Sequence, residues 1–507
     1  MGAIDVIAIA AYAAAVLWVG RLATTHARAA SARQDWALAG RALPTPAVLA
    51  SMVATEVSAA TFIGVPHAAY TGDWSYLQLA FGALAGKLVL AVRVIPLYHA
   101  RGVVTVYEFL DERFGPSTRR SAAACFAIGR SFASGARLFI AAFAFSAATG
   151  VPVSASILGC ALVAGLYTRS GGLRAVVWTD CLQAAVLVAG GSAALALASG
   201  ALDGGVGAFA EWLAREQRAR VFHLERWITW SSISPMPLGN ALVAGFFLTL
   251  ATHATDHDMV QRLLAARSGR AGGRALWLSA LVNFPMTLLF LSLGSAIAYA
   301  YSVSPPAYDI SDAREALPLF AAHALPAGVR GLVFAGLFAA AMSSLDSAVC
   351  AIATTWLRDV RPPVRSGDDP PLEAIRRVST WSCTALAVAA LAMAGYQELL
   401  RRGNAPLPSM VEFALSAMTI LYGALLGVFA VAVLRPGRSR DRAGCAALAV
   451  GAAAGLALFL QPLLGATTGP AWGYWIPLSA TLAAGVALLP LGRTARHPGA
   501  GAPPAKR

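Results

Sequence analysis

The sequence contains few charged residues for its length. Asp, Glu, Lys and Arg make up 13% of the 507 residues, whereas they make up roughly 25% of an average soluble domain. Hydrophobic residues account for 58% of the chain, and its mean hydropathy is +0.63. This composition excludes an assembly of soluble domains and predicts a protein that crosses a membrane many times. The net charge of +14 does not indicate nucleic-acid binding, because the basic residues lie between apolar runs, as membrane topology requires.

The sequence also lacks the patterns of metal, phosphate and catalytic sites. Its six cysteines lie singly in or beside apolar runs, without metal-ligand spacing or a disulfide framework. Gly171 and Gly172 indicate a turn and not a phosphate loop, since no GxxxxGK[ST] pattern follows them. No nucleophile and base are placed for hydrolysis, so we do not expect an enzyme. No basic leader precedes the first apolar run, residues 3–19, which we expect to be a retained helix.

Long apolar runs recur along the whole chain. A helix needs about 20 apolar residues to cross the hydrocarbon core of a bilayer, and runs of this kind predict about thirteen transmembrane helices. They are expected at residues 3–20, 44–70, 75–98, 121–148, 152–168, 175–200, 237–263, 275–301, 328–357, 377–396, 408–434, 443–463 and 472–491. The expected fold class is therefore an all-α polytopic membrane protein.

Basic residues are distributed unevenly between the loops. About 27 of the 39 Lys and Arg residues fall in loops of one parity, and the positive-inside rule places that side in the cytoplasm. The N-terminus is then outside, the C-terminus is cytoplasmic, and the protein is expected in the inner (plasma) membrane. Its expected partners are lipid and a small-molecule substrate, without nucleic acid, and it is expected to be a monomer or a weak oligomer.

The helices can be divided into two blocks of five. Because each block has an odd number of helices, the second begins on the opposite side of the membrane, which gives an inverted repeat. The expected organisation is an extra N-terminal helix and cytoplasmic loop (1–43), a first repeat (44–200), an extracellular loop with an amphipathic helix (201–236), a second repeat (237–434), two C-terminal helices (435–491) and a disordered basic tail (492–507). A short helical pattern within residues 302–327 predicts an outer lid.

The run at residues 44–70 carries a charge near its centre. Glu56 lies within the small and hydroxylated cluster ATEVSAAT, residues 54–61. A carboxylate at that depth is costly and indicates a functional site. Transporters use helices that are interrupted near the membrane midplane, where freed backbone carbonyls coordinate ions. We therefore predict that this helix is broken close to Glu56.

Four stretches in this order resemble the sodium:solute symporter family, over roughly residues 36–435. They are residues 36–70, with LAGR at 38–41 and the cluster around Glu56, then GLYTRSGGLRAVVWTDCLQ at 165–183, ATHATDHDMVQRLL at 251–264, and GLVFAGLFAAAMSSLDSAVCAIATTWLRD at 331–359. The resemblance implies a secondary transporter with the LeuT-like five-plus-five inverted-repeat fold, driven by sodium as the co-transported ion.

The resemblance also implies a sodium site between the first and eighth core helices. Its ligands map onto the carbonyls of Ala54, Val57 and Ala340 and the hydroxyls of Ser343 and Ser344. The residues themselves agree, since two adjacent hydroxyls stand on an otherwise apolar span and a hard cation prefers oxygen ligands. The alternative is that both serines bond to their own helix or permit close helix packing.

A second cation site is implied at Asp180, Asp346 and Ser347. Ser343, Asp346 and Ser347 share one helix face, and some relatives use the equivalent of Asp180 for an additional sodium. The alternative is that Asp180 caps its helix or pairs with Arg174.

Candidate substrate-binding residues surround the predicted break: Glu56, Ser58, Thr61, Gln78, Arg137, Thr249, Thr252 and His253. Glu56 can hold a cation, titrate, or pair with a basic residue, for which Arg137 is the expected partner. Arg137 can instead recognise a substrate carboxylate, because its planar fork binds carboxylates with two hydrogen bonds, or pair with Glu412. Asp256, Asp258 and Arg262 are expected to form an inner gate.

These residues predict sodium-coupled import of a small organic solute, with a carboxylate as the favoured class. Two alternatives remain open. One is a proton-coupled symporter in which Glu56 or Asp346 titrates. The other is a transporter-like sensor that binds a solute without transporting it.

Overall fold

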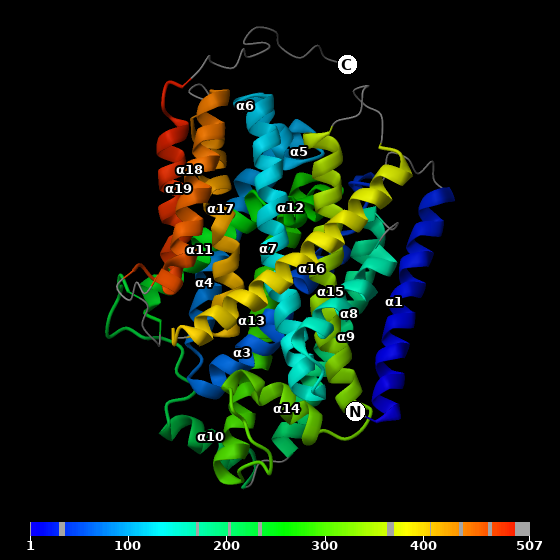
Figure 1. Cartoon of the computed structure of the whole chain (residues 1–507), viewed down its shortest axis with the longest axis vertical. Helices are drawn as coiled ribbons and strands as arrows, with labels where there is room; N and C mark the ends of the chain where they lie inside the picture. The colour runs from blue at the N-terminus through cyan, green and yellow to red at the C-terminus, as the bar shows by residue number, and fades with distance from the viewer. Residues whose placement is uncertain are drawn as a thin grey trace.

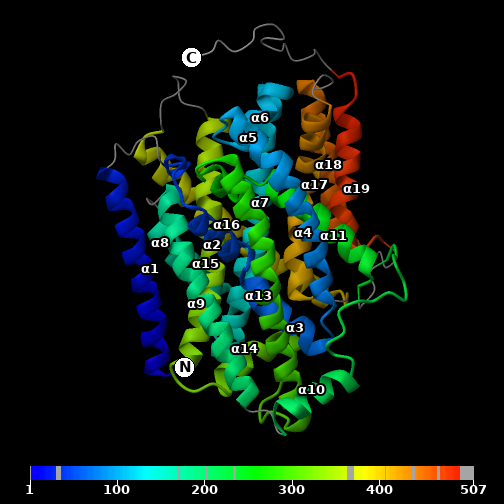
Figure 2. The same cartoon turned by 180° about the vertical axis from the view of Figure 1, so that it is seen from behind.

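The computed structural model describes residues 2–29, 36–168, 172–200, 204–231, 236–361, 370–405, 407–435, 440–464 and 469–491, and within these ranges the chain is helical and forms no β-sheet. The expected tail at 492–507 lies outside the described residues. The helices pack into a bundle with α6 at one end and α10 and α14 at the other (Figures 1 and 2). We call these the α6 end and the α14 end; the described N-terminus lies at the α14 end.

The first half of the chain contains α1 (Ala3–Ala29), α2 (Thr45–Glu56), α3 (Ala59–Thr71), α4 (Gln78–Val89), α5 (Ile95–Arg101), α6 (Val106–Arg113), α7 (Pro116–Thr149), α8 (Val153–Thr168), α9 (Gly172–Gly200) and α10 (Gly205–Arg215). The second half contains α11 (Leu238–Ala254), α12 (His257–Leu264), α13 (Gly269–Val303), α14 (Ala316–His323), α15 (Val329–Thr355), α16 (Leu372–Arg402), α17 (Met410–Leu434), α18 (Asp441–Leu460) and α19 (Trp475–Ala487).

In the described part of the chain, nine helices are long and apolar enough to cross a membrane, or up to eleven if each of two bent pairs counts as one span. Helices α8 and α19 are shorter than this test requires. The expected all-helical polytopic architecture is confirmed, whereas the expected count of about thirteen spans is not.

Two spans are broken. Helix α2 ends at Glu56 and α3 begins at Ala59, with a bend of 57° between them, and α11 and α12 meet at 63°. At the first break Val57 has φ −83° and ψ 81°, and Ser58 is extended. At the second break Asp256 is extended, and its side chain accepts a hydrogen bond from the Asp258 N–H. The sequence prediction of a break beside Glu56 is confirmed.

Buried helices form the centre of the bundle. Helices α15 and α17 are the most buried of the candidate spans, at 89% and 83% of their apolar windows, whereas α1 is 17% buried and lies on the periphery against α9 and α15 (Figure 1). The broken helices α2 and α3 pack on α13, and α11 packs on α4. The two halves of the first broken span, α2 and α3, therefore contact α13 and also the central helix α15.

Glycines bring α4 and α11 unusually close. A Cβ atom placed on Gly245 would lie 2.2 Å from the Leu79 carbonyl oxygen, and one on Gly82 would lie 2.3 Å from the Leu242 carbonyl oxygen. Small residues of this kind let membrane helices approach along their backbones. The two glycines act reciprocally, so each helix offers a backbone groove to the other.

We expect Gly245→Ala to destabilise the protein by about 1–3 kcal/mol, because backbone must shift to accept the new methyl group. Thermal unfolding of the purified protein measures the effect as a lower Tm. Gly395→Ala on α16 is the matched control, since a Cβ there would meet no atom within 4 Å. An unchanged Tm for Gly245→Ala would show that α4 and α11 do not cross at this distance.

Candidate functional site

The break between α2 and α3 redirects backbone hydrogen bonds. The Ser58 N–H donates to the Glu56 carbonyl oxygen at 3.1 Å, whereas in a continuous helix it would donate to Ala54. The Ser343 hydroxyl of α15 acts as the hydrogen-bond donor to Ala54 instead. Its Oγ lies 2.9 Å from the Ala54 carbonyl oxygen and 3.2 Å from that of Ala340. The first and eighth core helices are thus joined directly at the break.

Contacts through Ser343 and Ala340 link four of the five residues expected to hold sodium. Ser344 Oγ lies 3.5 Å from the Ala340 carbonyl oxygen, and both serines are fully buried. Val57 lies in the non-helical turn beside Ala54. Both serine hydroxyls approach their own helix at Ala340, as the alternative interpretation expected, and Ser343 also reaches across to α2.

Glu56 pairs with a lysine, so the prediction of Arg137 as its partner was wrong. Lys87 Nζ of α4 donates to Glu56 Oε2 at 2.6 Å, and the two side chains are 4% and 9% exposed. Ser279 Oγ lies 3.1 Å from Glu56 Oε1, and the Asn283 side-chain amide donates to Oε2. Both of these residues belong to α13. Packing of α13 against α2 and α4 therefore selects Lys87 as the partner.

Sequence reasoning overlooked Lys87 because it was counted within an apolar run. A signal was present, since Lys87 and Lys506 are the two lysines among the 39 basic residues. An ionisable residue inside a transmembrane segment indicates a functional or paired site by itself.

The expected substrate residues on α11 lie beside Glu56. His253 Nε2 is 2.9 Å from Glu56 Oε1, and Thr252 Oγ1 is 2.7 Å from His253 Nδ1. Thr249 is buried and faces Gly86 of α4. His253 thus has partners on both ring nitrogens within the protein.

The remaining expected substrate residues are divided between two places. Ser58 is buried as the N-cap of α3, and Thr61 lies one turn further along that helix. Gln78, by contrast, donates to the carbonyl oxygens of Ser75 and Met236, at 3.2 and 2.9 Å. Its amide therefore holds the start of α4 to the segment before α11, away from the break.

Arg137 is a buried cation of α7 and has neither of the carboxylate partners considered from the sequence. It is 6% exposed, and its Nη2 lies 3.7 Å from Met418 Sδ. Its Nη1 is buried without a hydrogen-bond partner among the described residues. Glu412 bonds to Ser409 in a capping box at the start of α17, and Glu56 is occupied by Lys87. Among the described residues, the guanidinium therefore has no carboxylate partner.

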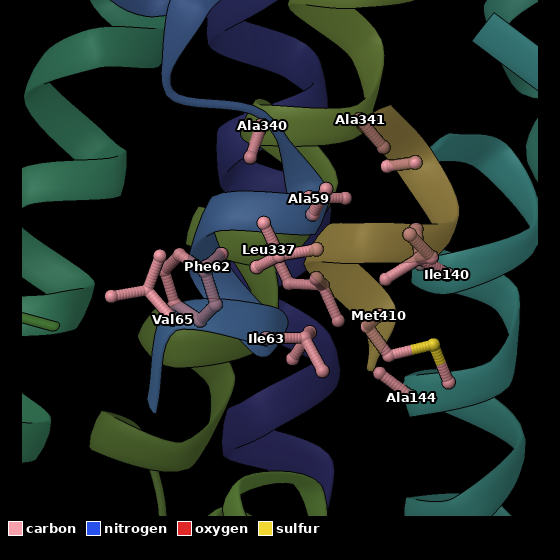
Figure 3. Packing of buried hydrophobic residues seen from close by; sticks show 14 of the residues in the cluster. Ala59, Phe62, Ile63, Val65, Ile140, Ala144, Leu337, Ala340, Ala341 and Met410 are labelled. Carbon is pink, nitrogen blue, oxygen red and sulfur yellow. The ribbon is translucent and has the colours of Figure 1, made fainter. Parts of the chain in front are cut away.

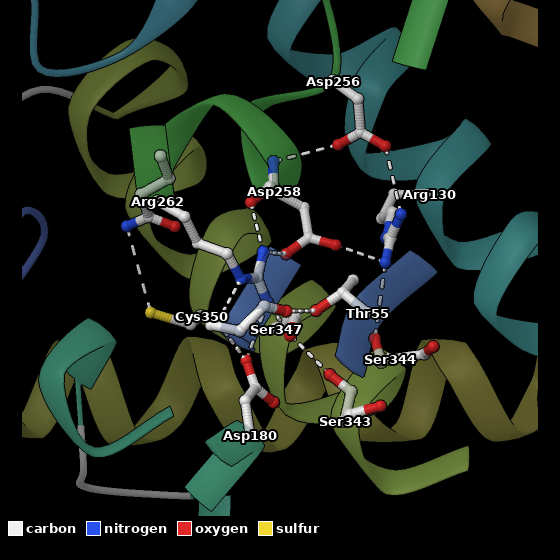
Figure 4. A network of polar contacts seen from close by, with 12 residues as sticks. Thr55, Arg130, Asp180, Asp256, Asp258, Arg262, Ser343, Ser344, Ser347 and Cys350 are labelled. Carbon is white, nitrogen blue, oxygen red and sulfur yellow. Dashed lines mark hydrogen bonds and ion pairs between the residues drawn. The ribbon is translucent and has the colours of Figure 1, made fainter. Parts of the chain in front are cut away.

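The residues expected to form an inner gate belong to a larger network of polar contacts (Figure 4). Arg130 of α7, which was not assigned to the gate, pairs with Asp256 at 3.1 Å and also with Asp258. The Tyr422 hydroxyl donates to the same Asp256 carboxylate. All of these side chains are at most 1% exposed. Because separating the partners of a buried ion pair is strongly destabilising, the network holds α12 against α7 and α17.

Arg262 extends this network to three more helices. Its Nη1 lies 2.8 Å from Asp258 Oδ1 and its Nη2 lies 3.3 Å from Asp180 Oδ2, while its Nε donates to Ser51 Oγ at 2.8 Å. It also donates to Ser347 Oγ. Asp180 therefore pairs with Arg262 and Ser51, and neither caps its helix nor pairs with Arg174.

The residues expected for a second cation lie around this network. Asp180 and Ser347 are both bonded to Arg262, and Asp346 is buried at 1% exposure between Leu345 and Ser347 on α15. One Asp180 oxygen, Oδ1, has no hydrogen-bond partner within the described chain.

An apolar cluster packs around α3, the half of the broken span that contacts α14 (Figure 3). Ile63 of α3, Ile140 and Ala144 of α7, and Met410 of α17 converge there. Ile63 follows Ala59 by one helical turn and precedes His67 by another, so it stands between the break and the surface.

Beyond this cluster lies an open polar pocket of about 550 Å³, lined by His67, Ser311, Asp312, Ala313, Arg314, Arg401, Leu407, Pro408 and Ser409. Burial acts to raise the pKa of Asp312, but hydrogen bonds from Arg314 outweigh it and the pKa lies below its ordinary value. The short helix α14, expected as an outer lid, follows directly after this segment.

Comparisons with known proteins agree with this geometry. A sequence model of the sodium:solute symporter family matches residues 36–437. The sodium/sialic acid symporter SiaT of Proteus mirabilis (strain HI4320) is 26% identical over 368 residues, which are 72% of this chain and 72% of the relative. The sodium/glucose cotransporter of Vibrio parahaemolyticus is 29% identical over 405 residues, which are 76% of this chain and 74% of the relative.

A solved structure of a Na⁺-coupled sialic acid symporter, in a substrate-bound outward-open state, matches the fold with a TM-score of 0.82. The match covers 98% of this chain and 99% of the other, at 22% identity. The LeuT-like fold is therefore confirmed. Because the family match spans most of the chain, this protein belongs to the sodium:solute symporter family, whose co-transported ion is sodium.

Proposed function

We propose that this protein imports a small organic anion, most favourably a carboxylate, by symport with sodium. The family gives sodium-coupled solute transport through a membrane. The named relatives transport a sugar and a sialic acid, so the family alone does not define the substrate. The proposed orientation has the α6 end in the cytoplasm and the α14 end outside; the excess of Lys and Arg in loops of one parity supports it.

The proposed sodium site consists of the carbonyls of Ala54, Val57 and Ala340 and the hydroxyls of Ser343 and Ser344. The Ala54 carbonyl, freed by the break, already accepts a hydrogen bond from Ser343. Sodium bound there would replace this single contact with several oxygen ligands from α2 and α15. It would therefore stabilise the arrangement in which the two helices lie together.

The unpaired guanidinium of Arg137 is the main support for an anionic substrate. The other buried arginines at the core of the bundle, Arg130 and Arg262, each contact two carboxylates, whereas Arg137 contacts a thioether. A buried cation without a partner is costly, and a substrate carboxylate would remove that cost. Ser58 and Thr61, at the start of α3, would contribute hydroxyls to the same substrate.

The proposed transport cycle uses the two barriers on either side of the break. The network of Arg130, Asp256, Asp258 and Arg262 closes the α6 end, and the cluster around Ile63 and Met410 separates the break from the pocket at the α14 end. Substrate and sodium would enter past the apolar cluster and leave after the polar network opens.

We expect Ser343→Ala and Ser344→Ala to raise the sodium concentration for half-maximal uptake at least about tenfold. Loss of one oxygen ligand to a charged group costs about 1.5 kcal/mol or more, and each 1.4 kcal/mol is a factor of ten. Uptake into proteoliposomes at fixed pH, with sodium replaced stepwise by choline, measures this. Thr355→Val is the matched control, because among the described residues its hydroxyl bonds only to the carbonyls of Ala351 and Ile352 in the same helix. Undiminished wild-type uptake in choline would reject sodium coupling.

Arg137→Gln is expected to weaken carboxylate binding at least about 30-fold, because loss of one partner of a buried charge pair costs about 2 kcal/mol or more. A thermal-shift screen of carboxylates, sugars, amino acids and vitamins, with and without sodium, identifies the stabilising ligand and then its affinity in the variant. Arg120→Gln, at an exposed position of the same helix, is the control. A carboxylate that stabilises Arg137→Gln as well as the wild type would remove Arg137 from the substrate site.

Arg262→Gln is expected to open the α6 end more often. Breaking a buried ion pair costs about 3–5 kcal/mol, which is ample for a tenfold change in the open population. Cys350, buried at 4% exposure within reach of Gln261, reports the opening in a variant whose other cysteines are serine. A membrane-impermeant thiol reagent applied to inside-out vesicles should label it at least about tenfold faster. The control is Arg101→Gln, which breaks an exposed ion pair at the same end, and equal labelling in the two variants would contradict the gate.

A further inference from the structure

Glu56 is held by four side chains from three other helices. Lys87 from α4, His253 from α11, and Ser279 and Asn283 from α13 all contact its carboxylate. Glu56 is the last residue of α2, where the helix dipole places partial negative charge. The carboxylate therefore needs a cation there, and the protein itself provides one.

The Lys87 ammonium has oxygen neighbours of the kind that bind a monovalent metal ion. Its Nζ lies 2.6 Å from Glu56 Oε2 and 2.9 Å from Ser279 Oγ. Another oxygen of the cluster, Asn283 Oδ1, is buried without a hydrogen-bond partner among the described residues. A carboxylate, a hydroxyl and an amide oxygen are ligands that suit a hard cation.

The choice of lysine at this position is specific. Every other basic residue up to Lys506 is arginine. Arginine carries a wide planar group, whereas the lysine ammonium is a compact point charge on a flexible chain. Lys87 is 3% exposed and reaches Glu56 from a neighbouring helix. A compact charge can contact the Glu56 and Ser279 oxygens at once, as the Lys87 ammonium does.

We propose that Lys87 is a tethered cation that fills an oxygen-lined site at Glu56, which a sodium ion would otherwise take. This inference rests on the proposed sodium coupling and adds a limit to it: Glu56 is neutralised by Lys87 throughout the cycle and binds no transported ion. The same contacts join α2, α4, α11 and α13 into one unit, which would move together against α15.

The number of sodium ions bound per molecule tests the proposal. Equilibrium binding of radiolabelled sodium to the purified full-length protein is expected to show one more ion in Lys87→Met than in the wild type. The double variant Glu56→Gln/Lys87→Met, which replaces the ion pair by neutral side chains of similar size, is expected to return to the wild-type number. A Lys87→Met protein that folds and gains no sodium would overturn the proposal.

The double variant keeps the test decisive if Lys87→Met does not fold. Its core contains no unpaired charge at this position, and it should bind as many sodium ions as the wild type. Loss of one ion in the double variant would show that Glu56 is a sodium ligand and would overturn the proposal. A wild-type protein that binds no sodium at all would instead reject the proposed function, so the two failures are distinguishable.

Discussion

A helix that stops inside a bilayer leaves backbone carbonyls without hydrogen-bond donors, and no water is present in the hydrocarbon core to replace them. The break at Val57 creates this situation at the centre of the bundle. The Ser343 hydroxyl approaches the freed Ala54 carbonyl at 2.9 Å from another helix. A carbonyl freed in this way needs a donor or a cation. A site that is rich in oxygen atoms and poor in donors therefore suits a small cation.

The ends of the broken helices influence where the charges lie. Asp256 caps α12 and Asp258 lies in its first turn, where the helix dipole favours negative charge. Glu56 lies at the opposite kind of end, where the dipole opposes it. The side chains that surround these carboxylates differ in the same way. The two aspartates pair with arginines, whereas Glu56 contacts Lys87, His253 and two polar residues of α13.

Local sequence determined the break and the identity of the charged residues, but it could not determine their pairing. The small residues around Glu56 predicted the interruption, and the adjacent hydroxyls of Ser343 and Ser344 indicated the facing helix. Whether Glu56 meets Arg137 or Lys87 depends on the rotation and height of α4 and α7 against α2, which no local pattern contains. The same applies to Asp180, which lies six residues from Arg174 yet bonds to Arg262, 82 positions away. Gln78 was assigned to the substrate site because a side-chain amide within an apolar span can hydrogen-bond a substrate, whereas its amide donates to the Met236 carbonyl oxygen in the segment before α11.

The polar network of Arg130 and Arg262 and the proposed sodium ligands meet on residues 343–347 of α15. Arg130 Nη2 lies 3.5 Å from the Ser344 carbonyl oxygen, and Arg262 donates to Ser347, whose hydroxyl donates to the Ser343 carbonyl oxygen. A change in the position of this segment would therefore alter both sets of contacts at once. Because packed interiors have few intermediate arrangements, such a segment tends to move between discrete positions. An ion that holds α2 to α15 would thereby also hold the partners of Arg130 and Arg262 in place, which gives a direct physical route from sodium occupancy to closure of the α6 end.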